Sequence, residues 1–88
     1  MQGVNTSGRE AVGESLEAQH ELLSGVAEAL DGRGRIAFRR VKIHVDARRI
    51  TLSGRVRSFY LKQLAQHVTA SVEGVWAVDN RLVVESRV

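Results

Sequence analysis

The chain has 88 residues, a net charge of +3 and no cysteine. This length allows a single domain with one modest core, so a deep, water-excluding active site would be hard to build. The lack of cysteine excludes a disulfide framework, a thiolate metal site and a cysteine nucleophile. Because the sequence has no run of 18 apolar residues and no basic or apolar region at its start, it predicts neither a transmembrane segment nor a signal peptide.

The charges are distributed unevenly along the chain. Residues 1–31 contain one arginine and six acidic side chains, whereas residues 32–57 contain nine cations and one aspartate. Most of these cations are arginines, whose planar guanidinium suits phosphate and carboxylate groups. The middle segment therefore predicts an anionic partner. An ordinary solvated surface rich in arginine would show the same excess, and the sequence does not separate the two interpretations.

The first third of the chain predicts a tail followed by a helix. Residues 1–13 are rich in small polar residues without periodicity, which predicts a disordered N-terminal tail, and residues 14–88 are predicted to form a single domain. Residues 15–30 predict an amphipathic helix with an acidic outer face. Its predicted apolar stripe comprises Leu16, Leu23, Val26, Ala27 and Leu30. Asp31 and Gly32 are expected to end the helix, which leaves residues 32–35 as a cationic loop.

The remaining elements are predicted from the spacing of apolar residues, which changes from helical spacing to the alternation of strands after residue 40. Residues 41–45 and 50–57 alternate apolar with polar side chains, which predicts a half-buried antiparallel hairpin. Ser58 is placed to cap a second helix that Gly74 should end. The apolar stripe of this helix comprises Leu61, Leu64, Ala65, Val68 and Val72. Residues 78–85 predict a third strand. The predicted fold is α+β in the order α-β-β-α-β, with two helices packed on one face of a three-stranded mixed sheet.

Three pieces of sequence occur in an order that resembles the BON domain, a small module of bacterial envelope proteins. They are Val-Lys-Ile-His-Val at 41–45, Ile-Thr-Leu-Ser-Gly-Arg-Val at 50–56 followed by Ser58, and Glu-Gly-Val-Trp-Ala-Val-Asp-Asn-Arg-Leu-Val-Val at 73–84. Gly54 is expected to leave room for a helix against the sheet. The hairpin turn departs from the family, because Asp46-Ala47-Arg48-Arg49 stands where the family usually has a glycine, and this argues against a tight primed turn.

The resemblance implies a non-catalytic module that attaches to anionic phospholipid or to another envelope component. It also implies a location in the bacterial envelope or periplasm, and it supplies neither a catalytic residue nor a cofactor. The sequence shows no signal peptide, so the compartment stays open between the cytoplasm and a domain excised from a longer envelope protein.

Strand pairing predicts where the cations gather. If the hairpin pairs Val45 with Ile50, Arg40 faces Arg55, and the first strand begins where the second ends. A right-handed crossover through the second helix makes the third strand parallel to the second. The predicted anion- and lipid-binding site at this end of the sheet comprises Arg39, Arg40, Lys42, Arg55, Arg57, Phe59 and Tyr60. The further cations expected there are Arg33, Arg35 and Arg87.

The exposed or buried state of five apolar side chains bears on this site. Phe59 and Tyr60 are either an anchor at a membrane interface or a cover over the end of the core, and the sequence favours the cover. Trp76 is expected at the opposite end, as a lid on the end of a helix. Ile36 and Phe38 precede the first strand, and their alternation predicts that both are buried rather than inserted into a bilayer.

The sequence predicts no enzyme. His20, His44 and His67 lie on three different predicted elements, without metal-ligand spacing, and are expected on the surface. The chain has neither a P-loop nor a dinucleotide-binding fingerprint. No catalytic residue, metal or cofactor is therefore assigned.

Three functions remain open at this point. The first is a BON-like module that attaches to anionic membrane or envelope surfaces. The second is assembly with a protein partner or with itself, through the open edges of the sheet or the acidic first helix. The third is nucleic-acid binding, which the sequence disfavours because the predicted outer sheet face has no aromatic stacking platform.

Overall fold

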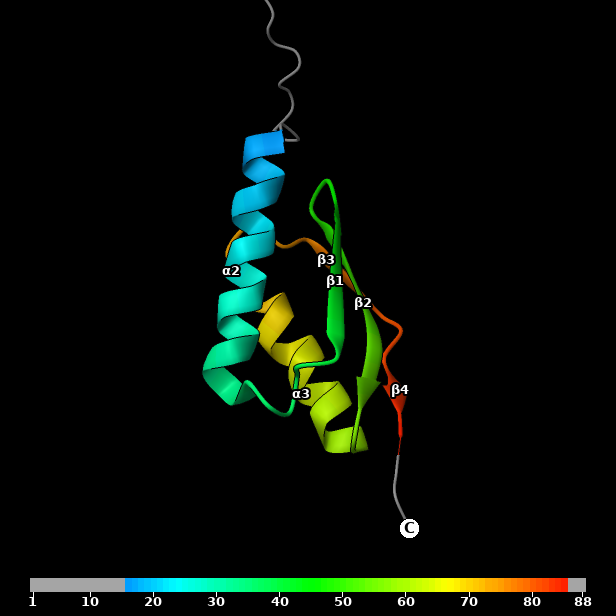
Figure 1. Cartoon of the computed structure of the whole chain (residues 1–88). Helices are drawn as coiled ribbons and strands as arrows, with labels where there is room; N and C mark the ends of the chain where they lie inside the picture. Colours follow the sequence, from blue (N-terminus) through cyan, green and yellow to red (C-terminus); the bar gives the residue numbers. More distant parts are fainter. Residues whose placement is uncertain (1–15, 86–88) are drawn as a thin grey trace, which may run out of the picture.

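A computed structural model of the protein describes residues 16–85 and shows two helices on one face of a mixed sheet (Figure 1). The elements are α2 (Leu16–Gly34), β1 (Val41–Asp46), β2 (Arg49–Val56), α3 (Phe59–Ala70), β3 (Ala77–Asn80) and β4 (Val83–Val84). The predicted α+β class and element order are confirmed, and the predicted third strand is divided into β3 and β4. The tail predicted at residues 1–13 lies outside the described residues.

The sheet is centred on β2. β1 pairs with it antiparallel, with Val45 opposite Ile50 as predicted. On the other side of β2, β3 and β4 pair with it in parallel and in one register, since Leu52 lies opposite Asn80 and Arg55 lies opposite Val83. The parallel pairing is interrupted only opposite residues 53–54 of β2, so the third strand is one strand with a local break.

The hairpin between β1 and β2 is tighter than the sequence predicts. Asp46 pairs with Arg49, which leaves a turn of two residues. Ala47 adopts a positive φ of 58°, and Arg48 does not. The turn is therefore tight although it has no glycine, but it is not a type I′ turn, which needs two residues with positive φ. The expectation against a tight primed turn thus holds for the type I′ geometry and is wrong about the length of the turn.

Helix α2 is longer than predicted and presents a different face to the core. It continues through Gly32 to Gly34, so the predicted loop at residues 32–35 is largely helical. Val26 and Leu30 are buried as predicted, but the other core-facing members are Leu22 and Ala29 rather than Leu23 and Ala27, and Leu16 is exposed. Buried Phe38 follows the helix, and its backbone N–H donates to the Gly34 carbonyl at 3.0 Å, which extends the helical turn past both glycines.

Helix α3 begins as the sequence predicts. The Oγ atom of Ser58 accepts a hydrogen bond from the Leu61 backbone N–H at 3.1 Å, which satisfies one of the free donors at the helix N-terminus. The helix ends at Ala70 with Ser71 as its C-cap, and not at Gly74. Gly74 instead adopts φ 99° in the turn that leads to β3.

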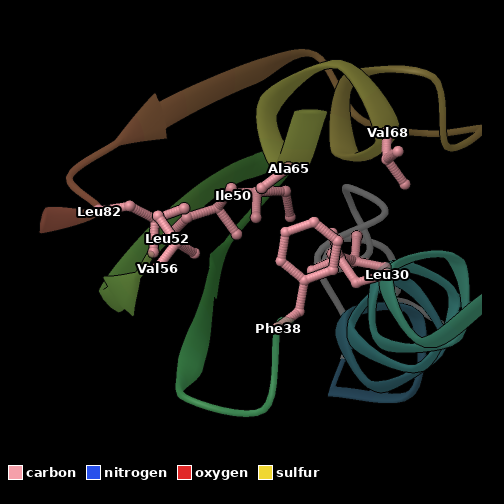
Figure 2. Close-up of a cluster of buried hydrophobic side chains, with 9 residues drawn as sticks. Leu30, Phe38, Ile50, Leu52, Val56, Ala65, Val68 and Leu82 are labelled. Atoms are coloured by element: carbon pink, nitrogen blue, oxygen red, sulfur yellow. The ribbon is translucent and has the colours of Figure 1, made fainter. Parts of the chain in front are cut away.

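The core lies between the two helices and the sheet (Figure 2). Ile50 and Leu52 of β2 are fully buried, and the ring of Phe38 points into the interior toward Leu30 of α2. Burying side chains of this size stabilises a fold by roughly 1.5–3 kcal/mol each. Thr69 on α3 is also fully buried, and its hydroxyl has no hydrogen-bond partner among the described residues.

Asn80 joins the break in the third strand to α3. Its Nδ2 donates to the Lys62 carbonyl at 2.9 Å and to Gln66 Oε1 at 3.2 Å, while its Oδ1 accepts from the Leu82 N–H at 3.1 Å. The bond from Leu82 satisfies a backbone N–H at the break, and the other two bonds attach the break to α3. They also hold β4, and therefore the end of the sheet, in a fixed position relative to the helix.

Candidate functional site

Five parts of the chain meet at one end of the sheet, at the lower end of Figure 1. They are the turn after α2, the start of β1, the end of β2, the start of α3 and β4. They surround an open pocket of about 500 Å³, which we name the arginine pocket. Its lining residues are Ile36, Ala37, Arg39, Arg40, Arg55, Val56, Arg57, Leu61 and Glu85.

Gly54 allows the two strands to approach closely at this pocket. It pairs with Val41 at the end of the hairpin ladder and adopts φ 103°, a conformation that L side chains rarely adopt. A Cβ atom at this position would lie 2.0 Å from the Arg40 carbonyl oxygen. The expected role of Gly54, room for a helix, is therefore wrong. The glycine makes room for the backbone that carries Arg40, and so it brings Arg40 beside Arg55.

The structure brings together four of the seven predicted site residues. Arg39 and Arg40 come from the turn before β1, and Arg55 and Arg57 come from the end of β2 and the residue after it. The other three predicted site residues, Lys42, Phe59 and Tyr60, do not line the pocket. Arg33 and Arg35 do not line it either, and Arg87 lies outside the described residues.

Large apolar side chains are exposed at the same end of the molecule. Phe59 and Tyr60, in the first turn of α3, are 61% and 66% exposed, so the interpretation that they cover the core is wrong. Ile36 is 81% exposed and lines the arginine pocket, so its predicted burial is wrong, whereas Phe38 is buried as predicted. The prediction for Ile36 assumed the apolar–polar alternation of a strand. Residues 35–40 form turns instead, so alternation does not determine which of their side chains are buried.

Glu85 is a pocket residue that the sequence prediction missed. Its Oε2 lies 2.9 Å from Arg55 Nη1, and its backbone N–H donates to the Val56 carbonyl at 2.8 Å. The signal was present, because a parallel third strand in register with β2 puts Val83 opposite Arg55. Glu85, two residues further, then points to the same face as Arg55 and close to it.

The arginines of the pocket differ in their partners. Arg55 is held by Glu85, whereas Arg39, Arg40 and Arg57 form no ion pair with the residues at 16–85. All four are exposed. Three guanidinium groups with their donors available, at an open pocket with an apolar wall, can bind a phosphate or carboxylate group through two of its oxygens.

The opposite end of the sheet has another composition. Trp76 is 80% exposed, so the prediction that it forms a lid on a helix end is wrong. The Trp76 backbone N–H donates to the Arg48 carbonyl at 2.9 Å, and the Arg48 guanidinium carbon lies 5.2 Å from the centre of the Trp76 ring. A smaller pocket of about 300 Å³ beside them includes Glu21, Glu73 and Arg48 in its lining. Cations and carboxylates are mixed at this end.

The described residues offer no metal cluster. His20, His44 and His67 are exposed and lie on α2, β1 and α3. No group of three or more His, Asp or Glu side chains within residues 16–85 could hold a metal ion. In the same part of the chain, neither helix has the length and apolar character needed to cross a bilayer.

Comparison with known proteins identifies the family. The BON domain matches residues 18–86, which takes in α2 from its third residue, α3 and every strand that the structure describes. No curated protein is a significant match to the sequence. Since the match spans most of the chain, the chain belongs to the BON domain family.

Proposed function

We propose that this BON domain is a non-catalytic module that attaches to anionic phospholipid surfaces through the arginine pocket and the exposed apolar side chains around it. The observation that carries the proposal is the coincidence, at one end of the sheet, of four arginines around one pocket with exposed Ile36, Phe59 and Tyr60. Membership of the BON family supports a phospholipid-binding role.

The two kinds of side chain contribute differently to attachment. A basic side chain near an anionic leaflet contributes about 1 kcal/mol, so the three arginines without a carboxylate partner would together contribute roughly 3 kcal/mol. Aromatic side chains favour the headgroup region, where an apolar ring and a polar tip are both accommodated. Phe59 and Tyr60 would therefore add affinity that salt does not screen, while the arginine contribution falls as ionic strength rises.

The outer sheet face supports this site over a nucleic-acid surface. Its outward side chains include Lys42, His44 and Arg55, and no aromatic residue of β1 or β2 offers a stacking platform. RNA-binding sheets use such aromatics to stack bases. We therefore place the anion site at the arginine pocket and not on the face of the sheet.

A charge-matched pair of variants tests the proposal. Arg40→Gln with Arg57→Gln removes two cations from the arginine pocket, and Arg48→Gln with Arg49→Gln removes two cations from the hairpin end. Co-sedimentation with phosphatidylglycerol vesicles should fall at least roughly tenfold for the first variant, given about 1 kcal/mol for each cation at the surface. The second variant should bind nearly as well as the original protein, and neither should bind phosphatidylcholine vesicles.

Two outcomes would count against the proposal. Equal losses from both variants would mean that net charge alone governs binding. Recovery of the original protein equally with phosphatidylglycerol and phosphatidylcholine vesicles would mean that the arginines do not select the surface. Circular dichroism of each variant separates a loss of binding from a loss of fold.

A further inference from the structure

We infer that Glu85 is a built-in competitor for the anion that the arginine pocket binds, and that it restricts the pocket to densely anionic surfaces. The inference rests on the proposed function and adds a residue that sets the selectivity of the same site. Glu85 is the one carboxylate among the nine residues that line the pocket, and it forms an ion pair with one of the four arginines there.

The backbone keeps the Glu85 carboxylate at the pocket. The Glu85 N–H donates to the Val56 carbonyl at 2.8 Å, in line with the parallel pairing of Val56 with Val84. Asn80 holds the preceding break of the strand against α3. The side chain therefore starts from a fixed point beside the end of β2, at 2.9 Å from Arg55.

The ion pair is weak enough to be exchanged. The side chains of Arg55 and Glu85 are 57% and 47% exposed, so water and salt reach both groups. Exposed ion pairs of this kind give little net stabilisation in water. A phosphate that enters the pocket can take the place of the Glu85 carboxylate on Arg55, but the displaced carboxylate then lies beside the bound anion and repels it.

This exchange makes binding depend on the charge density of the surface. A surface with few anionic lipids presents one headgroup whose phosphate is not balanced by a choline cation, and that phosphate competes with a carboxylate already attached to Arg55. A densely anionic surface presents several such headgroups, which engage Arg39, Arg40 and Arg57 together and outweigh the loss of the ion pair. Glu85 therefore sets the fraction of anionic lipid at which attachment begins.

The test compares two variants that change the net charge equally. Glu85→Gln removes the carboxylate from the arginine pocket, and Glu73→Gln removes one from the smaller pocket at the opposite end. Vesicles contain an increasing fraction of phosphatidylglycerol in phosphatidylcholine at constant salt. Glu85→Gln should reach half-maximal binding at a lower phosphatidylglycerol fraction, and at an intermediate fraction its affinity should rise about 2- to 5-fold, which is within the range that loss of an exposed ion pair allows. Glu73→Gln should stay within about twofold of the original protein.

The outcomes separate this inference from the proposed function. If the original protein binds phosphatidylglycerol vesicles and the two variants gain equally, the proposed function stands and the role of Glu85 is overturned. If the original protein does not bind, the proposed function fails, and titration with inorganic pyrophosphate decides the role of Glu85. Tighter pyrophosphate binding by Glu85→Gln than by Glu73→Gln, seen as shifts of the Arg55 guanidinium NMR signals, supports the competitor. Equal binding by both variants overturns it.

Discussion

Replacement of Gly54 by alanine tests how the arginine pocket is built. The glycine adopts φ 103°, and an added Cβ atom would meet the Arg40 carbonyl oxygen at 2.0 Å. Cβ atoms essentially never come closer than 3.0 Å to such an atom, so the strand that begins after Arg40 must move. Backbone oxygen, unlike the end of a flexible side chain, cannot turn aside, so the alanine disturbs the Val41 end of the β1–β2 ladder.

Two terms set the size of the effect. A residue with a side chain in a sparsely populated backbone region costs roughly 1–3 kcal/mol. Overpacking that forces the backbone to shift costs a further 1–3 kcal/mol. Together they predict that Gly54→Ala lowers the free energy of unfolding by about 2–6 kcal/mol. Single domains are stable by about 5–15 kcal/mol, so the variant should lose a large part of its stability.

Urea denaturation followed by circular dichroism measures this change, and Gly32→Ala is the matched control. Gly32 lies within α2, and an added Cβ atom meets nothing within 4 Å. Alanine is the better helix former there, so the control should be stabilised by up to about 1 kcal/mol. If Gly54→Ala stays within about 0.5 kcal/mol of the original protein, a range typical of neutral surface changes, the close approach of Arg40 to Gly54 does not exist in solution.

Two further predictions concern polar groups that hold the fold, and urea denaturation measures both. Thr69→Val removes a fully buried hydroxyl that has no partner among the described residues. The free energy of unfolding should therefore rise by about 1 kcal/mol. A fall of that size would show that the hydroxyl is hydrogen-bonded. Asn80→Ala removes the bonds to the Lys62 carbonyl and to the Leu82 N–H, and it should lower the free energy of unfolding by about 1–3 kcal/mol. Gln66→Ala, which loses only an exposed bond of 3.2 Å to Asn80, should have little effect, and equal losses from the two variants would contradict this assignment.

The sequence predicted those parts of the fold in which one local rule dominates. Alternation placed both hairpin strands, and with Val45 opposite Ile50 it fixed their register. Ser58 marked the first turn of α3 because a serine before an apolar stripe is a strong N-cap. The family match covers these segments.

The predictions from sequence were wrong where two neighbouring residues could equally well face the core or end a helix. Leu22 and Leu23 are adjacent leucines, and only packing against the sheet and α3 decides that Leu22 faces the core. The end of α2 at Gly34 is set by the burial of Phe38 further along the chain, so the earlier Asp31-Gly32 stop signal is overridden. Tertiary contacts of this kind outweigh local propensity.

The sequence predicted the part of the candidate site that follows from strand pairing, and it missed the part that depends on tertiary contacts. The pairing of strands brings Arg40 to Arg55, and this depends on register alone, so the arginines of the pocket could be named in advance. The apolar wall at Ile36 and the carboxylate of Glu85 depend on the turn after α2 and on the parallel pairing of β4. The position of Ile36 needs the assembled fold, whereas Glu85 could have been placed beside Arg55 from the predicted parallel third strand.

The central claim is that one end of this BON domain, the arginine pocket with its exposed apolar neighbours, contacts the anionic surface. Amide NMR spectra of the labelled protein, recorded with bicelles that contain phosphatidylglycerol, test it most directly. If this end of the domain contacts the lipid, shifts and line broadening will concentrate at Ile36, Arg40, Arg57 and Tyr60 and spare the hairpin turn at Ala47. Equal changes at both ends, or changes centred on the hairpin turn, would contradict it.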